Sequence, residues 1–149
     1  MNDQRPVTIV MIEDDDGHAR LIEKNIRRAG INNLIRHFTD GTQALDYLHN
    51  DESGPALNGP ALILLDLNLP DMSGTDILAR IKSDDSPLRR TPVVELTTTD
   101  DKLEVQRCYD LGCNVYITKP VNYESFAQAI KQLGLFLSVI QLPDPDAAA

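Results

Sequence analysis

One segment of the chain reads Ala61-Leu62-Ile63-Leu64-Leu65-Asp66-Leu67-Asn68-Leu69-Pro70-Asp71-Met72-Ser73-Gly74. Its first five residues are apolar without polar alternation and are too few for a typical helix, so they predict a strand buried on both faces, as in a parallel sheet. Pro70 and the closing Ser-Gly pair stop this strand and lead into a helix that begins near Thr75. Asp66 is therefore expected at the carboxyl end of a central strand, where open α/β sheets bind their ligands.

Strands and helices alternate along the rest of the sequence. Short apolar runs predict the strands, and apolar residues at helical spacing predict the helices. The expected strands are residues 7–12, 33–38, 61–65, 91–97 and 113–118, and the expected helices are residues 19–29, 40–48, 75–82, 100–111 and 122–140. Five strand-helix units in succession predict an α/β fold with a doubly wound, five-stranded parallel sheet and helices on both faces.

Length and composition limit the possible functions. The chain has 149 residues, which corresponds to one domain. A net charge of −9 and a pI near 4.6 argue against DNA or RNA as a ligand, because phosphate contacts need clustered lysine and arginine. No apolar segment approaches the roughly 20 residues that span a bilayer, and the polar start is no signal peptide. We therefore expect a cytoplasmic protein that binds neither nucleic acid nor membrane.

Other reactive residues show no spacing typical of a site. Cys108 and Cys113 lie on either side of Gly112, between an expected helix and the next strand, and the sequence has no second cysteine pair for a zinc site. We expect both to be buried free thiols. Glu95 interrupts an apolar strand, where a buried carboxylate is costly unless it is paired. We expect Glu95 to be solvated, partnered or at an interface.

Polar residues follow four of the expected strands and converge on one edge of the sheet. They are Glu13 and Asp14 after the first strand, Asp66 after the third, Thr97 at the end of the fourth and Lys119 after the fifth. Carboxylates on neighbouring strands repel one another, so such a cluster is stable only when it is protonated or bridged by a cation. Magnesium is the hard cation that prefers oxygen ligands and also binds phosphate oxygens.

Phosphoryl transfer needs this combination of groups. The charge on the transferred group would be met by a metal on one side and by Lys119 on the other. Asp66 would be the nucleophile, since carboxylates can form acyl phosphates. Each residue alone has an ordinary explanation: the acids could cap a helix, Thr97 suits any strand and Lys119 could be solvated. Their convergence on one edge of the sheet favours a site.

This set of residues resembles the receiver domain of two-component response regulators, and the resemblance covers residues 7–133. It implies the flavodoxin-like receiver fold with strand order 2-1-3-4-5. It also implies a phosphoacceptor signalling protein, which catalyses only its own phosphorylation and dephosphorylation and is otherwise no enzyme.

The resemblance assigns a role to each matching position. Asp66 is the phosphoacceptor, and Thr97 and Lys119 contact the phosphoryl group. Thr97 and Tyr116 form the switch that responds to phosphorylation. The implied magnesium ligands are Glu13, Asp14, Asp66 and the backbone carbonyl of Asn68.

The last part of the sequence resembles a particular subgroup of this family. Residues 133–143 are apolar all round, which is more than one face of a packed helix needs. This segment is similar to the tail of small single-domain regulators that pair with cyanobacterial and bacterial phytochromes. The similarity implies a sensor histidine kinase, of the bacteriophytochrome type, as partner, and signalling through protein contacts. We expect a receiver at residues 1–142 that includes an extended C-terminal helix, then a flexible tail at residues 143–149.

The same segment predicts a homodimer. Val139, Ile140 and Leu142 lie beyond the expected core and would form an exposed apolar strip in a monomer. Pairing with the same segment of a second chain would cover it. The alternative is a last helix that simply completes the core of its own chain.

The residues after the first strand argue against two other functions. A phosphohydrolase with an aspartyl nucleophile would carry a D-x-D-x-T/V pattern after the first strand, but here residues 14–18 have histidine at the last position. A flavodoxin-like binding module would need a phosphate-binding loop there, and the row of four acids at residues 13–16 would repel a phosphate.

Overall fold

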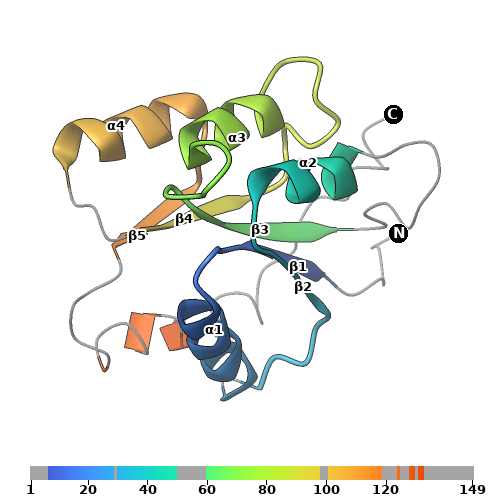
Figure 1. Ribbon diagram of the computed structural model, residues 1–149, viewed down its shortest axis with the longest axis vertical. Coiled ribbons are helices and arrows are strands. Elements are labelled where there is room, and N and C mark those ends of the chain that lie inside the picture. Colours follow the sequence, from blue (N-terminus) through green and yellow to red (C-terminus); the bar gives the residue numbers. More distant parts are fainter. Residues whose placement is uncertain are drawn as a thin grey trace.

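The computed structural model describes residues 7–28, 30–49, 60–97 and 101–118, together with residues 124, 128, 129, 131 and 132. Among these residues, five strands form one parallel sheet in the order β2-β1-β3-β4-β5 (Figure 1). The strands are β1 (Thr8–Ile12), β2 (Ile35–Phe38), β3 (Ala61–Asp66), β4 (Val93–Thr97) and β5 (Val115–Thr118). The helices are α1 (Asp16–Arg28), α2 (Gly41–His49), α3 (Gly74–Ile81) and α4 (Lys102–Leu111). The predicted fold class and strand order are confirmed.

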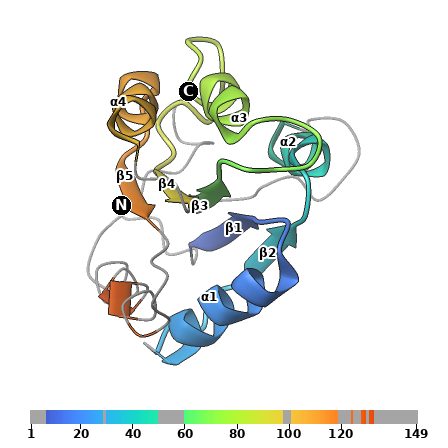
Figure 2. The ribbon, with the colours of Figure 1, turned by 60° about the vertical axis from the view of Figure 1, so that its left-hand side comes forward.

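Helices cover both faces of the sheet. Figure 2 shows α1 on one side and α2, α3 and α4 on the other. Side chains alternate between the faces of a strand, so a strand covered on both faces must be apolar at nearly every position. The central strand β3 is buried at all of its positions. Its side chains contribute to two hydrophobic cores. Leu62 and Leu64 belong to the core on the α1 side, and Ile63 and Leu65 belong to the core on the opposite face of the sheet.

Strand register brings the carboxyl ends of three strands together. Ile12 of β1 pairs with Leu65 of β3, so the residues that follow both strands emerge side by side. Asp66 of β3 pairs with Leu96 of β4, which places Thr97 at the same edge. The predicted convergence of strand ends is therefore present in the fold.

Helix starts differ slightly from the sequence prediction, because polar caps carry no apolar periodicity. The Asp15 carboxylate accepts the His18 N–H at 2.9 Å, so α1 begins before its first apolar residue. The Asp101 carboxylate accepts the Leu103 N–H at 2.9 Å and starts α4. This helix ends at Gly112, whose φ of 107° is easily adopted only by glycine.

Several expectations can be compared with the described residues. Cys108 and Cys113 are buried free thiols, as predicted, but Cys108 lies inside α4 rather than between the helix and the strand. Residues 124, 128, 129, 131 and 132 are helical, and the rest of the expected helix at 122–140 lies outside the described residues, as does the apolar segment at 133–143. None of the helices in the described part of the chain has the length and apolar character of a membrane span.

Candidate functional site

Three carboxylates meet at the carboxyl edge of the sheet. Glu13 and Asp14 follow β1, and Asp66 ends β3. Each residue offers an oxygen, and these oxygens all lie within 4.8 Å of one another. Glu13 and Asp66 are buried, at 2% and 6% exposed, whereas Asp14 is exposed. The cluster is thus half enclosed by the protein and open to solvent on the Asp14 side.

Neighbouring groups orient these carboxylates. The Asn68 N–H donates to Asp66 Oδ1 at 2.9 Å, and the Asp15 N–H donates to Glu13 Oε2 at 3.3 Å. His18 Nδ1 lies 3.7 Å from Glu13 Oε1, where it adds a positive charge only when protonated. Backbone N–H groups stabilise single carboxylates but leave the repulsion among three of them.

The donor set fits a divalent metal ion. All of the clustered atoms are carboxylate oxygens, the ligands that hard divalent cations prefer. A bound cation would offset the mutual repulsion of the three side chains. The open side at Asp14 would leave room for water molecules and for a ligand that supplies further oxygens.

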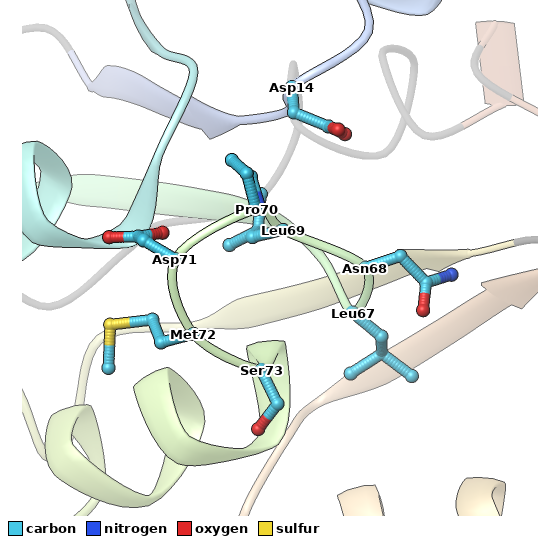
Figure 3. Close-up of a pocket in the computed structure, with 8 residues that line it drawn as sticks. All are labelled: Asp14, Leu67, Asn68, Leu69, Pro70, Asp71, Met72 and Ser73. Carbon is cyan, nitrogen blue, oxygen red and sulfur yellow. The ribbon is translucent and has the colours of Figure 1, made fainter.

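A loop closes the site on its other side. Residues 67–73, here called the metal loop, connect β3 to α3 and, together with Asp14, line an open cavity of about 510 Å³. Figure 3 shows Asp14 across this cavity from the loop that carries Asn68 and Asp71. The loop folds back tightly on β3: a Cβ at position 74 would lie 2.5 Å from the Asp66 carbonyl oxygen, so only glycine fits there.

The remaining predicted residues lie on β4 and β5. Thr97 is the last residue of β4 and pairs with Thr118 of β5, so its backbone is at the same edge as Asp66. Lys119 directly follows β5 and lies outside the described residues. Tyr116 pairs with Glu95 across β4 and β5 and packs, partly buried, against the core that faces α2 to α4.

Of the three environments expected for Glu95, the solvated one is wrong. Glu95 is 0% exposed in the middle of β4, so it is not solvated, and among the described residues neither of its carboxyl oxygens has a hydrogen-bond partner. Burial, followed by the negative charges of Asp66 and Glu104, raises its pKa from 4.5 to about 9. Glu95 is therefore a neutral acid at physiological pH, and a neutral carboxyl group costs far less to bury than a carboxylate.

The thiols near Glu95 are unreactive for the same reason. Burial raises the pKa of Cys108 to about 12 and that of Cys113 to about 11, with a further contribution from Glu95. Thiols with such pKa values carry almost no thiolate at neutral pH. The structure gives these cysteines no role at the carboxylate cluster.

Asp71 is a residue of the site region that the sequence analysis did not single out. Its carboxylate accepts the N–H groups of Gly41 and Thr42, at 2.9 and 2.8 Å, and so joins the metal loop to the start of α2. The partners are about thirty positions away in the sequence, and no local pattern indicates such a contact.

Comparison with known proteins identifies the family. The response regulator receiver domain matches residues 9–131. A response regulator receiver domain from Rhodospirillum rubrum is 66% identical, with a TM-score of 0.84, over 93% of this chain and 98% of that one. The phosphorylated cyanobacterial phytochrome response regulator RcpA is 35% identical, with a TM-score of 0.82, over 93% of this chain and 99% of that one.

A third relative is known with a metal. The Mn²⁺-bound form of response regulator Rcp1 has a TM-score of 0.83 and 32% identity, over 93% of this chain and 99% of that one. The Rcp1 sequence from Synechocystis aligns over 139 residues, which are 93% of this chain and 94% of Rcp1. With its receiver sequence pattern, its strand order and its acidic cluster, this chain belongs to the response regulator receiver family.

Proposed function

We propose that this receiver accepts a phosphoryl group on Asp66 from a sensor histidine kinase, and that the transfer needs Mg²⁺. One observation carries the proposal: oxygens of Glu13, Asp14 and Asp66 lie within 4.8 Å of one another at the carboxyl edge of a receiver sheet. Glu13, Asp14, Asp66 and the backbone carbonyl of Asn68 would hold the ion. When bound, Mg²⁺ would neutralise charge on the carboxylates and on the incoming phosphoryl oxygens.

The surroundings of the Asp66 side chain support this role. A carboxylate oxygen of Asp66 attacks the phosphorus of the kinase phosphohistidine, the P–N bond breaks, and an acyl phosphate forms. The Asn68 N–H at 2.9 Å holds the carboxylate in one orientation. The buried strand β3 below it provides a rigid base. Thr97 and Lys119 would contact the transferred group from the ends of β4 and β5.

The effect of phosphorylation would be read on the α4 and β5 side of the molecule. The new charge and acceptor oxygens would draw Thr97 toward the phosphoryl group and let Tyr116 change position behind it. Tyr116 is suited to this, because it lies on β5, at the margin of the core and next to α4: its N–H donates to the Tyr109 hydroxyl at 3.2 Å. Signalling would then proceed through protein contacts in the cytoplasm.

A kinase of the bacteriophytochrome type is the proposed donor. The similarity to RcpA and Rcp1 supports this choice. A bacteriophytochrome histidine kinase that carries a radiolabelled phosphoryl group is mixed with this protein and Mg²⁺. The labelled group is expected to move from the kinase to the receiver within minutes, as followed by gel autoradiography. EDTA is the control and should stop the transfer. The proposal would be contradicted if the phosphoryl group were transferred at the same rate with EDTA, or if it were not transferred to the receiver in the presence of Mg²⁺.

We also propose a homodimer built by the C-terminal helix and its extension, with residues 1–142 as the receiver unit and residues 143–149 as a flexible tail. Burial of Val139, Ile140 and Leu142 against a second chain would offer roughly 1.5 to 3 kcal/mol per side chain before association entropy. Truncation after Leu137 is therefore expected to convert a dimer to a monomer in sedimentation experiments and to leave phosphorylation intact. A full-length chain that sediments as a monomer, with and without phosphorylation, would rule out the dimer.

A further inference from the structure

The metal loop at residues 67–73 is fixed at its base by local contacts. The Gly74 N–H donates to the Leu67 carbonyl at 2.9 Å, and Asn68 and Ser73 form an isolated bridge. These contacts hold the two ends of the loop together. The tip of the loop, residues 69–72, lies between these two ends.

The tip is tied to α2 through Asp71. One carboxylate oxygen accepts the Gly41 N–H at 2.9 Å, and the other accepts the Thr42 N–H at 2.8 Å and the Thr42 hydroxyl. Gly41 and Thr42 begin α2, so their N–H groups have no acceptor within the helix. Asp71 therefore caps this helix from a segment thirty residues away in the sequence.

The electrostatics strengthen this contact. The Thr42 hydroxyl and the Gly41 N–H lower the pKa of Asp71 from 3.8 to about 2, so the side chain is ionised at neutral pH. Hydrogen bonds to a carboxylate are stronger than those to a neutral acceptor, and a negative charge is favourable at the N-terminus of a helix. The link is thus formed over the whole physiological pH range.

Close packing at the start of α2 restricts the position of the loop tip. A Cβ at position 41 would lie 2.6 Å from Met72 Cγ and 2.7 Å from Ile77 Cδ1, so the loop and α3 both press against the start of α2. The helix itself is held on the sheet by its buried residues Ala44, Leu45 and Leu48. It is therefore a rigid support for the tip of the loop.

We propose that Asp71 is a positioning residue for the metal site: it fastens the metal loop to α2 and so holds Asn68, whose backbone carbonyl would be a ligand of the cation, in place. The inference rests on the proposed function. Without Asp71 the loop would have to become ordered when the cation binds, and the cost of that ordering would appear as weaker binding.

The chain contains a matched control. Asp40 also caps α2, since its carboxylate accepts the Gln43 N–H at 2.8 Å, but Asp40 is not part of the metal loop. Asp71→Ala and Asp40→Ala each remove one carboxylate cap from the same helix. Only the first also releases the loop, so the pair separates positioning of the site from stability of the helix.

The experiment is a Mg²⁺ titration of the unphosphorylated protein, followed by the amide NMR signals of residues 13, 14, 66 and 68. We expect Asp71→Ala to raise the half-saturating Mg²⁺ concentration by about 10-fold. Asp71→Asn keeps one acceptor oxygen and should lie between Asp71→Ala and wild type. Asp40→Ala should bind Mg²⁺ as wild type does, although its melting temperature falls.

The outcomes separate the inference from the proposed function. Absence of Mg²⁺ shifts in the wild-type protein would refute the proposed function itself. Wild-type shifts together with an unchanged half-saturation point in Asp71→Ala would overturn the positioning role alone, and so would an equal loss in Asp40→Ala. If circular dichroism shows that Asp71→Ala does not fold, the Asp71→Asn variant provides the test instead. A wild-type affinity for Mg²⁺ in that variant would overturn the positioning role of Asp71.

Discussion

Replacement of Asp66 by asparagine is expected to abolish phosphorylation. An amide is a far weaker nucleophile than a carboxylate, and it also removes one charge from the cluster of Glu13, Asp14 and Asp66. Incorporation of phosphate from acetyl phosphate in the presence of Mg²⁺, measured by intact mass, should fall below detection. The fold should be retained, because asparagine has nearly the same shape as aspartate.

Asp84→Asn is the matched control for this variant. Asp84 is exposed in the connection after α3, and its carboxylate lies 4.0 Å from the Arg89 guanidinium at the surface. The same change of charge there should leave labelling at the wild-type level. Stoichiometric labelling of Asp66→Asn at the wild-type rate would show that another residue is the phosphoacceptor.

The second large effect is expected at Glu95, in the dependence of stability on pH. Between pH 4.5 and about 9 the folded protein keeps the proton on Glu95, whereas the unfolded chain has released it. The unfolded chain then binds fewer protons, so the free energy of unfolding falls as the pH rises, by about 1.4 kcal/mol per pH unit from this group. Urea unfolding measured from pH 5 to pH 9 tests this slope.

Two variants and a control assign the slope to this residue. Glu95→Gln cannot titrate, so its stability should vary much less over the same pH range. Glu95→Leu should be more stable than wild type at pH 8, because it replaces a buried group that finds no partner among the described residues. Asp84→Asn changes an exposed acid that does not contribute to the pKa of Glu95, and it should keep the wild-type slope. Parallel pH profiles for wild type and Glu95→Gln would contradict the account.

Features that depend on local sequence pattern and on strand position could be predicted from the sequence. The unbroken apolar run before Asp66 predicted a strand covered on both faces, and β3 is buried throughout. Parallel topology then placed Glu13, Asp14 and Asp66 at one edge, which the 4.8 Å cluster confirms. Helix starts at Asp16 and Lys102 were less predictable, because they depend on single capping carboxylates rather than on periodicity.

Features that depend on distant contacts could not be read in advance. The sequence shows that Glu95 is an acid in an apolar strand, but not that the fold would bury it completely without a hydrogen-bond partner from the described residues. The link from Asp71 to Gly41 and Thr42 joins the metal loop to the start of α2, and these two segments are adjacent only after the sheet has formed. Both features follow from tertiary packing rather than from local propensity.

The most direct test of the central claim is chemical mapping of the phosphorylated residue. The protein is incubated with acetyl phosphate and Mg²⁺ and then treated with borohydride, which reduces an acyl phosphate to an alcohol and so converts a phosphorylated aspartate to homoserine. Peptide mass spectrometry then locates the product. We predict homoserine at position 66, and only in the sample that contained Mg²⁺. Homoserine at another aspartate, or continuous phosphate release with no modified peptide, would contradict this prediction.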